Sequence, residues 1–355
     1  MVYLKLIQKL FALILCVGLS GCWDPQDFRF QCVDDGECLD GYRCGVVSPE
    51  SGEPTCLPES SEFFVYDDPD ATNQPEDLRC EPDPGSGPDI ESSWVIVKPG
   101  CFYQGSPMNE PGRDPNEGPL HPVTFTYSFL LSSAPVTQSQ WSELMASAPF
   151  VFDSCGGDCP VEGVNWYEAV HFANLLSDQE GLPRCYQLAG CNGVPGTACP
   201  DPSAGPCFDG YSCSSIEFLG LDCSGYRLPT EAEWEFAVRS GKSTPFFTNL
   251  ADTAIFGENS GGQPHPVRSL DPNPWGLFDM IGNVSEWVHS GFQDYTDAPQ
   301  IDPVGVDNWD FRSYRGCSWR DEASDCRAAA RFGGAPTMKT DFLGFRLART
   351  LGRDE

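Results

Sequence analysis

The segment from Tyr226 to Gly241 fixes the position of one helix more sharply than any other stretch of the chain. Thr230 is a typical N-cap residue, because its hydroxyl can accept a backbone N–H that has no partner inside the helix. Glu233 stands three positions later, where its side chain can reach back to the N–H of the cap and complete a capping box. Pro229 disfavours helix before this point, and Gly241 is a typical terminator. The sequence therefore predicts a helix of about three turns between them.

Two further capping boxes begin at Thr137 and Asn165 and predict helices over residues 138–146 and 166–179. The second helix carries an apolar stripe at helical spacing. Strands are predicted at two runs, Trp94–Val97 and the alternating segment Thr124–Leu131. Between these elements the chain is rich in Gly, Pro, Asn and Asp. This pattern favours an α+β fold with much irregular structure.

Shifts in composition divide the chain into four parts. Few apolar residues and many prolines indicate an extended linker, whereas a short segment with several cysteines indicates a disulfide-held module. The predicted parts are a signal peptide at 1–21, a cysteine-rich module at 22–60, an acidic Pro-rich linker at 61–91 and a main domain at 92–350. The cysteine-rich module is either a small binding module or a spacer.

The first residues have the features of an export signal. Lys5 and Lys9 form a positive start, and the apolar run 10–19 is too short to span a bilayer. Leu19-Ser20-Gly21-Cys22 resembles a bacterial lipoprotein cleavage box, in which Cys22 is diacylated and becomes the N-terminus. The alternative is an ordinary cleaved signal with a chance cysteine. We expect a lipid-anchored protein of the cell envelope, with inner and outer membrane left open.

Eighteen cysteines fit an exported chain. Cys16 leaves with the signal and Cys22 carries lipid, so sixteen remain (18 − 2). In an oxidising compartment they favour disulfides over metal thiolates. Six of them lie in 182–225, which predicts a disulfide-held loop insertion, and Cys155 and Cys159 predict a local bridge.

The net charge is strongly negative. Removal of residues 1–21 takes away two lysines and no acidic residue, so the net charge changes from −31 to −33. Such a surface repels phosphate backbones and anionic lipid headgroups. Nucleic acid is therefore excluded as a partner.

The sequence at the start of the predicted helix is Arg-Leu-Pro-Thr-Glu-Ala-Glu-Trp-Glu. It resembles the signature of the formylglycine-generating enzyme family, also called the sulfatase-modifying factor family. Similar blocks follow in family order from Val97 to Leu347. They include Pro160-Val161-Glu162-Gly163-Val164-Asn165-Trp166, the run from Asn273 to Trp287, and Leu343-Gly344-Phe345-Arg346-Leu347. The resemblance implies a C-type-lectin-like α+β fold with little regular secondary structure, here rich in disulfides.

The resemblance also implies which residues carry the family's oxidase chemistry. The oxidase holds Cu(I) with cysteines three and eight positions after a serine, because soft thiolates select Cu(I). Here Ser318 is followed by Asp321 at the first position and Cys326 at the second, and Cys317 is an additional cysteine nearby. A local Cys317–Cys326 disulfide is the simplest interpretation, and a copper pair is the alternative. Phe342 also replaces the oxidase's asparagine before Leu-Gly-Phe-Arg. We therefore do not expect copper, and Cys317, Cys326 and Ser318 remain catalytic candidates only.

The block from Trp275 to Trp287 is the candidate metal site. By resemblance to calcium-binding relatives, the ligands are the side chains of Asp279 and Glu286 and the carbonyls of Gly282 and Val284. Ca²⁺ prefers several hard oxygen ligands, which a tight turn with two carboxylates can supply. The alternative is that the two acids only cap or pair locally. The sequence thus predicts a structural calcium ion.

Three functions are consistent with these patterns. The first is an envelope lipoprotein whose enzyme-like domain binds a protein or peptide ligand, or has another non-oxidase role, because the thiol pair is incomplete. The second is a formylglycine-generating oxidase that acts on cysteine in exported substrates. The third is a structural envelope component that contacts partners through its disulfide-held loops.

Overall fold

The computed structural model describes residues 42–46, 54–58, 90–91, 93–199, 205–244, 249–306 and 310–351. The chain forms two compact units, Met1–Arg79 and Cys80–Glu355. The described part of the first unit is an antiparallel hairpin of β1 (Tyr42–Val46) and β2 (Pro54–Pro58). The predicted signal peptide, Cys22 and nearly all of the predicted linker lie outside the described residues.

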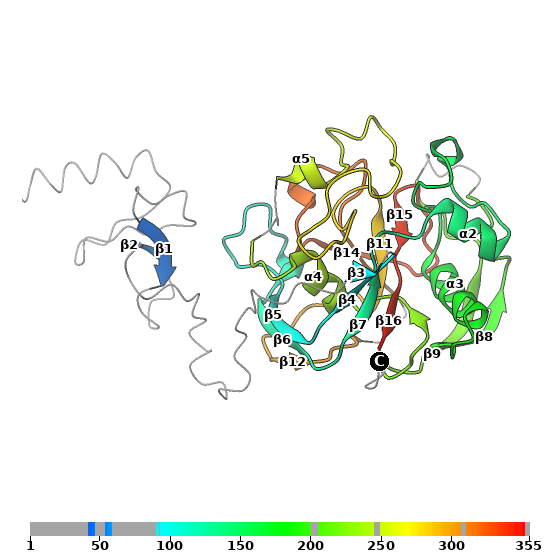
Figure 1. Ribbon diagram of the computed structural model, residues 1–355, viewed down its shortest axis with the longest axis horizontal. Coiled ribbons are helices and arrows are strands. Elements are labelled where there is room, and N and C mark those ends of the chain that lie inside the picture. The colour runs from blue at the N-terminus through cyan, green and yellow to red at the C-terminus, as the bar shows by residue number, and fades with distance from the viewer. Residues whose placement is uncertain are drawn as a thin grey trace, which may run out of the picture. The chain divides into compact units, whose positions relative to one another are not determined.

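Three sheets organise the second unit (Figure 1). The antiparallel five-stranded sheet has the order β10 (Tyr226–Arg227), β16 (Ala348–Thr350), β7 (Phe129–Ser132), β4 (Trp94–Val97) and β3 (Ile90–Glu91). The four-stranded sheet has the order β14 (Arg331–Gly334), β13 (Arg312–Arg315), β11 (Ser285–Gly291) and β15 (Leu343–Phe345), with β11 and β15 parallel. The three-stranded sheet has the order β12 (Gln300–Ile301), β6 (His121–Phe125) and β5 (Gly100–Gln104). β16, the last strand of the unit, therefore pairs with β7, which lies early in the unit.

The predicted strand over 124–131 is wrong. This segment divides between β6 and β7, which belong to different sheets. Between them, Thr126 donates its backbone N–H and its hydroxyl to the carboxylate of Asp302, at 2.8 and 2.5 Å. The apolar alternation hides this break, because the residue that fixes it lies far away along the chain.

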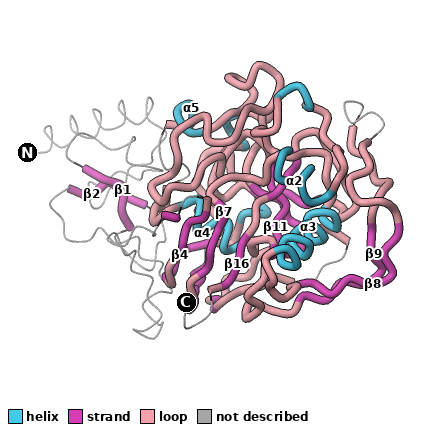
Figure 2. The backbone as a smooth tube through the Cα atoms, turned by 45° about the vertical axis from the view of Figure 1, so that its right-hand side comes forward, coloured by secondary structure: helices cyan, strands magenta, loops and turns pink. Residues whose placement is uncertain are grey.

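The three predicted capping boxes are confirmed. They begin α2 (Gln138–Met145), α3 (Trp166–Gln179) and α4 (Glu231–Arg239). The helix α4 ends at Arg239, and its C-cap is Ser240, one residue before the predicted glycine, with a left-handed φ of 44°. A short α5 (Leu250–Thr253) and single turns at Pro115–Glu117, Asp153–Cys155 and Ala323–Asp325 complete the helices of the described residues. Loops make up much of the rest (Figure 2), as expected from the composition.

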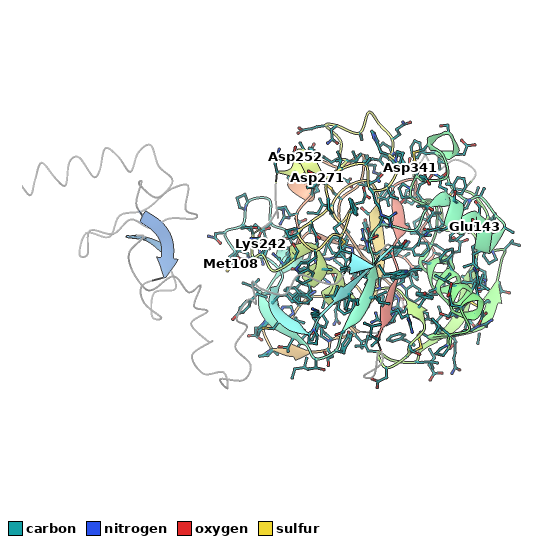
Figure 3. All side chains as sticks on the ribbon, viewed as in Figure 1. Met108, Glu143, Lys242, Asp252, Asp271 and Asp341 are labelled. Carbon is teal, nitrogen blue, oxygen red and sulfur yellow. A yellow bond between two sulfur atoms is a disulfide. The ribbon has the colours of Figure 1, made fainter. Side chains whose placement is uncertain are left out.

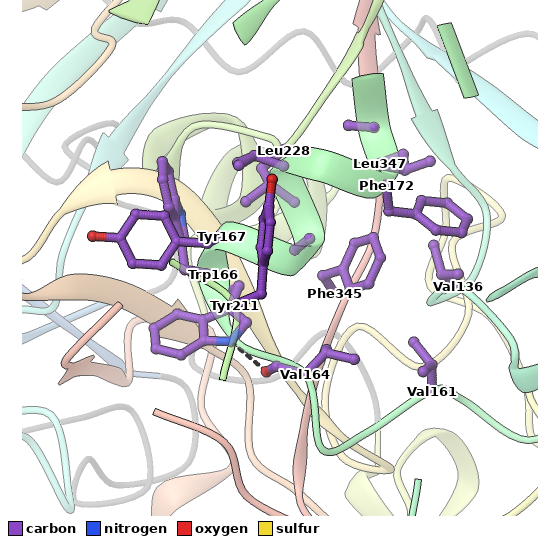
Figure 4. Packing of buried hydrophobic residues seen from close by; sticks show 14 of the residues in the cluster. Val136, Val161, Val164, Trp166, Tyr167, Phe172, Tyr211, Leu228, Phe345 and Leu347 are labelled. Atoms are coloured by element: carbon purple, nitrogen blue, oxygen red, sulfur yellow. Dashed lines mark hydrogen bonds between the residues drawn. The ribbon is translucent and has the colours of Figure 1, made fainter. Parts of the chain in front are cut away.

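Two apolar clusters form the core. The first surrounds α3, where Phe172 packs edge-on against Phe345 with ring centroids 5.4 Å apart (Figure 4). The second surrounds α4 and includes Trp234 together with the sulfurs of Cys317 and Cys326. The signature helix and the candidate cysteines therefore share one hydrophobic core.

Disulfides hold the loops, as predicted. Cys155 bonds to Cys159. The insertion at 182–225 is held by three bridges, Cys185–Cys223, Cys191–Cys213 and Cys199–Cys207. It is not only loop, however, since β8 (Tyr186–Asn192) and β9 (Ser212–Phe218) pair as an antiparallel hairpin. Over the described ranges, no helix has the length and apolar character needed to cross a membrane.

Candidate functional site

The signature helix α4 supplies three buried glutamates, and each forms an ion pair with a buried arginine. The pairs are Glu231 with Arg331, Glu233 with Arg227, and Glu235 with both Arg239 and Arg315. Every carboxylate oxygen of the three glutamates accepts a hydrogen bond. Burial raises the pKa of Glu231, but Arg331 reverses this effect and holds the pKa below its ordinary value. These acids are saturated by the scaffold and have no capacity left for chemistry.

The two candidate cysteines are bonded to each other. Cys317 and Cys326 form a disulfide, and both residues are fully buried. The predicted local bridge is confirmed. A sulfur in a disulfide is not a thiolate, and a cysteine acts as a nucleophile or binds Cu(I) through its thiolate.

Ser318 and Asp321 form a closed hydrogen-bonded turn next to this disulfide. The hydroxyl of Ser318 donates to Asp321 Oδ2 at 2.6 Å, and its backbone N–H donates to the same oxygen at 2.8 Å. The backbone N–H of Asp321 in turn donates a hydrogen bond to the carbonyl of Ser318 at 3.2 Å. The carboxylate at the first-cysteine position therefore caps a turn, and the candidate serine is its hydrogen-bond donor.

A pocket of about 420 Å³ opens beside this turn. It is lined by Gly257, Glu258 and the run Arg320-Asp321-Glu322-Ala323-Ser324. Among the lining residues, Arg320 is the one cation beside three carboxylates. The carboxyl of Asp325 lies near this pocket, and partial burial, with repulsion from Asp321 and Glu322, raises its pKa. The pocket is therefore strongly acidic.

Three of the predicted calcium ligands, Asp279, Gly282 and Val284, lie in or directly after one tight turn, and the fourth, Glu286, is in the strand β11 that follows. Asp279, Gly282 and Asn283 all have left-handed φ values, of 51°, 85° and 63°. A Cβ at Gly282 would collide with the backbone of Ile255, so the close approach requires glycine. The turn also supports the neighbouring site, because the N–H of Trp319 donates to the carbonyl of Asn283 at 2.9 Å.

The two carboxylates of this turn differ in charge compensation. Glu286 accepts from Arg346 through both oxygens, at 2.7 and 2.8 Å, and from the indole of Trp234. Among the described residues, the carboxylate of Asp279 accepts only from neutral groups, the backbone N–H of Arg268 at 2.8 Å and the amide of Asn283 at 3.2 Å. Burial accordingly raises the pKa of Asp279. The hard oxygens fit calcium on the Asp279 side, whereas Arg346 already neutralises Glu286.

A third group of acids was missed as a site by the sequence. Glu162 is fully buried and accepts the N–H groups of Val151 and Phe152 through Oε1, but its Oε2 has no hydrogen-bond partner among the described residues. Burial, with a contribution from Asp341, raises the pKa of Glu162 to about 8. Thr340 Oγ1 and Asp341 Oδ1 are also buried without a hydrogen bond.

The two segments of this group are held together by the backbone, since the N–H of Gly163 donates to the carbonyl of Thr340 at 2.9 Å. The sequence contains only a faint signal of this arrangement. Glu162 stands within an apolar run, and that position suggests burial but no partner. A buried acid with a free oxygen is unusual and calls for an explanation.

Comparison with known proteins gives one family. The FGE-sulfatase family, described as a sulfatase-modifying factor enzyme 1-like domain, matches residues 86–351. The inactive C-alpha-formylglycine-generating enzyme 2 of Mus musculus is 37% identical over 298 residues, covering 74% of this chain and 87% of that protein. The formylglycine-generating enzyme of Streptomyces coelicolor is 28% identical over 295 residues, covering 76% and 93%.

Two further similarities extend this comparison. The chaperone protein LppX of Paenibacillus barcinonensis is 30% identical over 181 residues, which cover 45% of this chain and 61% of that protein. Among solved structures, Treponema denticola variable protein 1 superimposes with a TM-score of 0.60 at 28% identity, covering 73% of this chain and 95% of that one. The fold is thus shared by proteins with different names, among them a formylglycine-generating enzyme and a chaperone protein.

Proposed function

We propose, given that the chain belongs to the FGE-sulfatase family of sulfatase-modifying factor enzyme 1-like domains, that its main domain binds a protein or peptide ligand and does not oxidise cysteine. The observation that carries this proposal is the buried disulfide between Cys317 and Cys326. A copper oxidase of this family needs two converging thiolates, and this bond removes both sulfurs from metal chemistry.

The remaining position of the copper pair supports the same conclusion. Asp321 stands where the first thiolate is expected, and a carboxylate is a hard ligand that does not select Cu(I). Its Oδ2 is already engaged by the N–H and the hydroxyl of Ser318. The acidic pocket beside this turn, about 420 Å³ in volume, offers a ligand a cavity of ordinary size.

The relatives are in keeping with a binding role in the envelope. The mouse relative is named an inactive formylglycine-generating enzyme, and the Paenibacillus relative is named a chaperone. We infer that this chain is a lipoprotein anchored through Cys22, with its main domain facing the periplasm or the exterior. Palmitate labelling of cells that express the full chain tests the anchor, since the Cys22→Ser variant is expected to lose the label.

The alternative function is a formylglycine-generating oxidase, which the Streptomyces relative favours. Purified protein, reduced and then loaded with Cu(I), is incubated with a peptide that contains Cys-x-Pro-x-Arg, and mass spectrometry follows the conversion of thiol to aldehyde. We expect no conversion. Aldehyde formation that Cys326→Ser abolishes and Cys155→Ser leaves intact would overturn the proposal. Cys155 is a suitable control because it belongs to a separate local bridge.

We also propose a structural calcium ion at the turn of Asp279, held by that carboxylate with the carbonyls of Gly282 and Val284 and with Glu286 at its edge. Support comes from the burial of Asp279, whose carboxylate accepts hydrogen bonds from a backbone N–H and an amide but, among the described residues, from no arginine side chain. Calcium at about a hundred times its Kd should stabilise the fold by ~2.7 kcal/mol. Thermal unfolding in calcium and in chelator is expected to show this shift in wild type and in the exposed control Asp271→Asn, but not in Asp279→Asn. A shift that persists in Asp279→Asn contradicts the assignment.

A further inference from the structure

The side chain of Arg320 covers a recognition seat made by Asp341 and Phe342. Its guanidinium carbon lies 3.7 Å from the centroid of the Phe342 ring, and its Nη1 lies 3.6 Å from Asp341 Oδ1. Figure 3 labels Asp341 at the upper edge of the main unit. An aromatic face beside a carboxylate attracts a planar cation by stacking and by charge. The seat thus holds a guanidinium that comes from the chain itself.

Arg320 holds this seat loosely. A distance of 3.6 Å exceeds the range of an N–H···O hydrogen bond, so Asp341 Oδ1 is left without one. The side chain of Arg320 is 47% exposed, whereas that of Asp341 is 10% exposed. A half-exposed ion pair at this distance contributes little to stability. The seat is therefore built into the fold, while its occupant is replaceable.

The surroundings of the seat contain buried polar atoms without partners. Glu162 Oε2 and Thr340 Oγ1 are buried without hydrogen-bond partners within the described part of the chain. The indole N–H of Trp319 is used by the backbone carbonyl of Asp341, at 3.0 Å. On its other side, Arg320 lines the acidic pocket with Glu258, Asp321 and Glu322. A ligand that enters here meets negative charge on the pocket side and polar atoms without partners on the other side.

We propose that the Asp341–Phe342 seat binds the guanidinium of an arginine side chain from a protein ligand, which displaces Arg320. This proposal rests on the proposed binding function and specifies the chemistry of the ligand. A planar guanidinium fits better than an ammonium, because it stacks on Phe342 while it hydrogen-bonds to Asp341 Oδ1. The strong negative charge of the whole chain also favours a basic partner.

The test uses the mature full chain and two peptides, acetyl-Gly-Arg-Gly amide and its neutral analogue with citrulline in place of arginine. Titration calorimetry is expected to show binding of the arginine peptide about tenfold tighter than of the analogue, which corresponds to a stacked and paired cation. Asp341→Asn is expected to remove this preference, whereas the exposed control Asp271→Asn keeps it. Equal affinity for both peptides, or binding of neither, overturns the proposal.

Arg320→Ala gives an independent outcome that a purely structural role does not produce. Removal of the internal occupant is expected to tighten binding of the arginine peptide, because the ligand no longer competes with it. The matched control Arg184→Ala removes another exposed arginine, paired with Asp178, and should leave affinity unchanged. Weaker binding by Arg320→Ala overturns displacement. The two proposals can be told apart, because aldehyde formation in the oxidase assay contradicts the non-oxidase role and does not bear on the arginine preference.

Discussion

The helix α4 and the recognition seat both contain buried carboxylates, but they treat them in opposite ways. On α4, each oxygen of Glu231, Glu233 and Glu235 accepts a hydrogen bond, and each carboxylate faces an arginine. In the seat region, Glu162 Oε2 and Asp341 Oδ1 accept none. We call α4 the closed region, because its carboxylate oxygens all accept hydrogen bonds. We call the surroundings of Asp341 the open region, because two carboxylate oxygens there accept none.

This difference indicates where the scaffold ends and the variable function begins. A buried ion pair is stable only when it is complete, since an uncompensated charge in the interior is costly. The signature that identifies the family therefore marks a completed network that supports the fold. Function in such a fold depends on the sites that the network leaves open. The region around Asp341 is open in this sense, whereas the disulfide has closed the position of the oxidase thiols.

The largest expected effect comes from breaking the closed region. Glu235 is fully buried and accepts from Arg315, from Arg239 at 2.8 Å and from the N–H of Gly105 at 2.8 Å. Glu235→Ala leaves two buried arginines without their carboxylate and should lower the free energy of unfolding by about 3–5 kcal/mol. Urea unfolding at neutral pH measures it.

The control for this prediction is Glu143→Ala on the exposed face of α2 (Figure 3), where the change should stay within about 0.5 kcal/mol. If Glu235→Ala loses no more stability than this control, then the ion pairs of α4 are not the support that we describe.

Glu162, in the open region, should make the free energy of unfolding fall as pH rises. A carboxylate with a lowered pKa, such as Glu231 on α4, has the opposite effect. The pKa of Glu162 is about 8 in the folded protein and near the ordinary 4.5 when unfolded. Between these values the folded state holds a proton that the unfolded state has lost, so stability falls as pH rises and levels off above pH 8. Glu162→Gln removes this dependence. The variant should gain on wild type by at most about 1.4 kcal/mol per pH unit from pH 5 to pH 8.

Urea unfolding of both proteins at several pH values across this window checks the prediction. Other titrating groups cancel in the difference between the two proteins, and Glu143→Gln serves as the control. Parallel pH profiles for wild type and Glu162→Gln would mean that Glu162 is compensated by a partner, and the contrast with α4 would disappear.

Sequence reasoning succeeded where the determining residues are close together in the chain. The capping boxes at Thr137, Asn165 and Thr230 each span three residues, and the Cys317–Cys326 bridge spans nine. Local geometry sets these features, so a single sequence contains the information. The calcium site remains a prediction, although Asp279 and Gly282 do lie in one tight turn just before Glu286 in β11.

Sequence reasoning failed where distant segments decide the outcome. The break in the strand predicted over 124–131 depends on Asp302, and the raised pKa of the buried Glu162 depends in part on Asp341. No periodicity reports such contacts, because it describes one face of one element at a time. Whether a buried oxygen has a hydrogen-bond partner depends on the packing of segments that are distant in the chain.

The smallest expected change in the free energy of unfolding comes from a substitution in the seat itself. Asp341→Asn removes a charge whose Oδ1 makes no hydrogen bond and whose ion pair with Arg320 is long and half-exposed. The free energy of unfolding should therefore change by less than about 1 kcal/mol at pH 7, against several for Glu235→Ala. Burial raises the pKa of Asp341, so neutralising it also removes a small cost of charge burial that offsets the lost pair. Urea unfolding of the two variants side by side measures the ratio. A loss for Asp341→Asn as large as that for Glu235→Ala would show that the seat is part of the scaffold and is not kept open for a ligand.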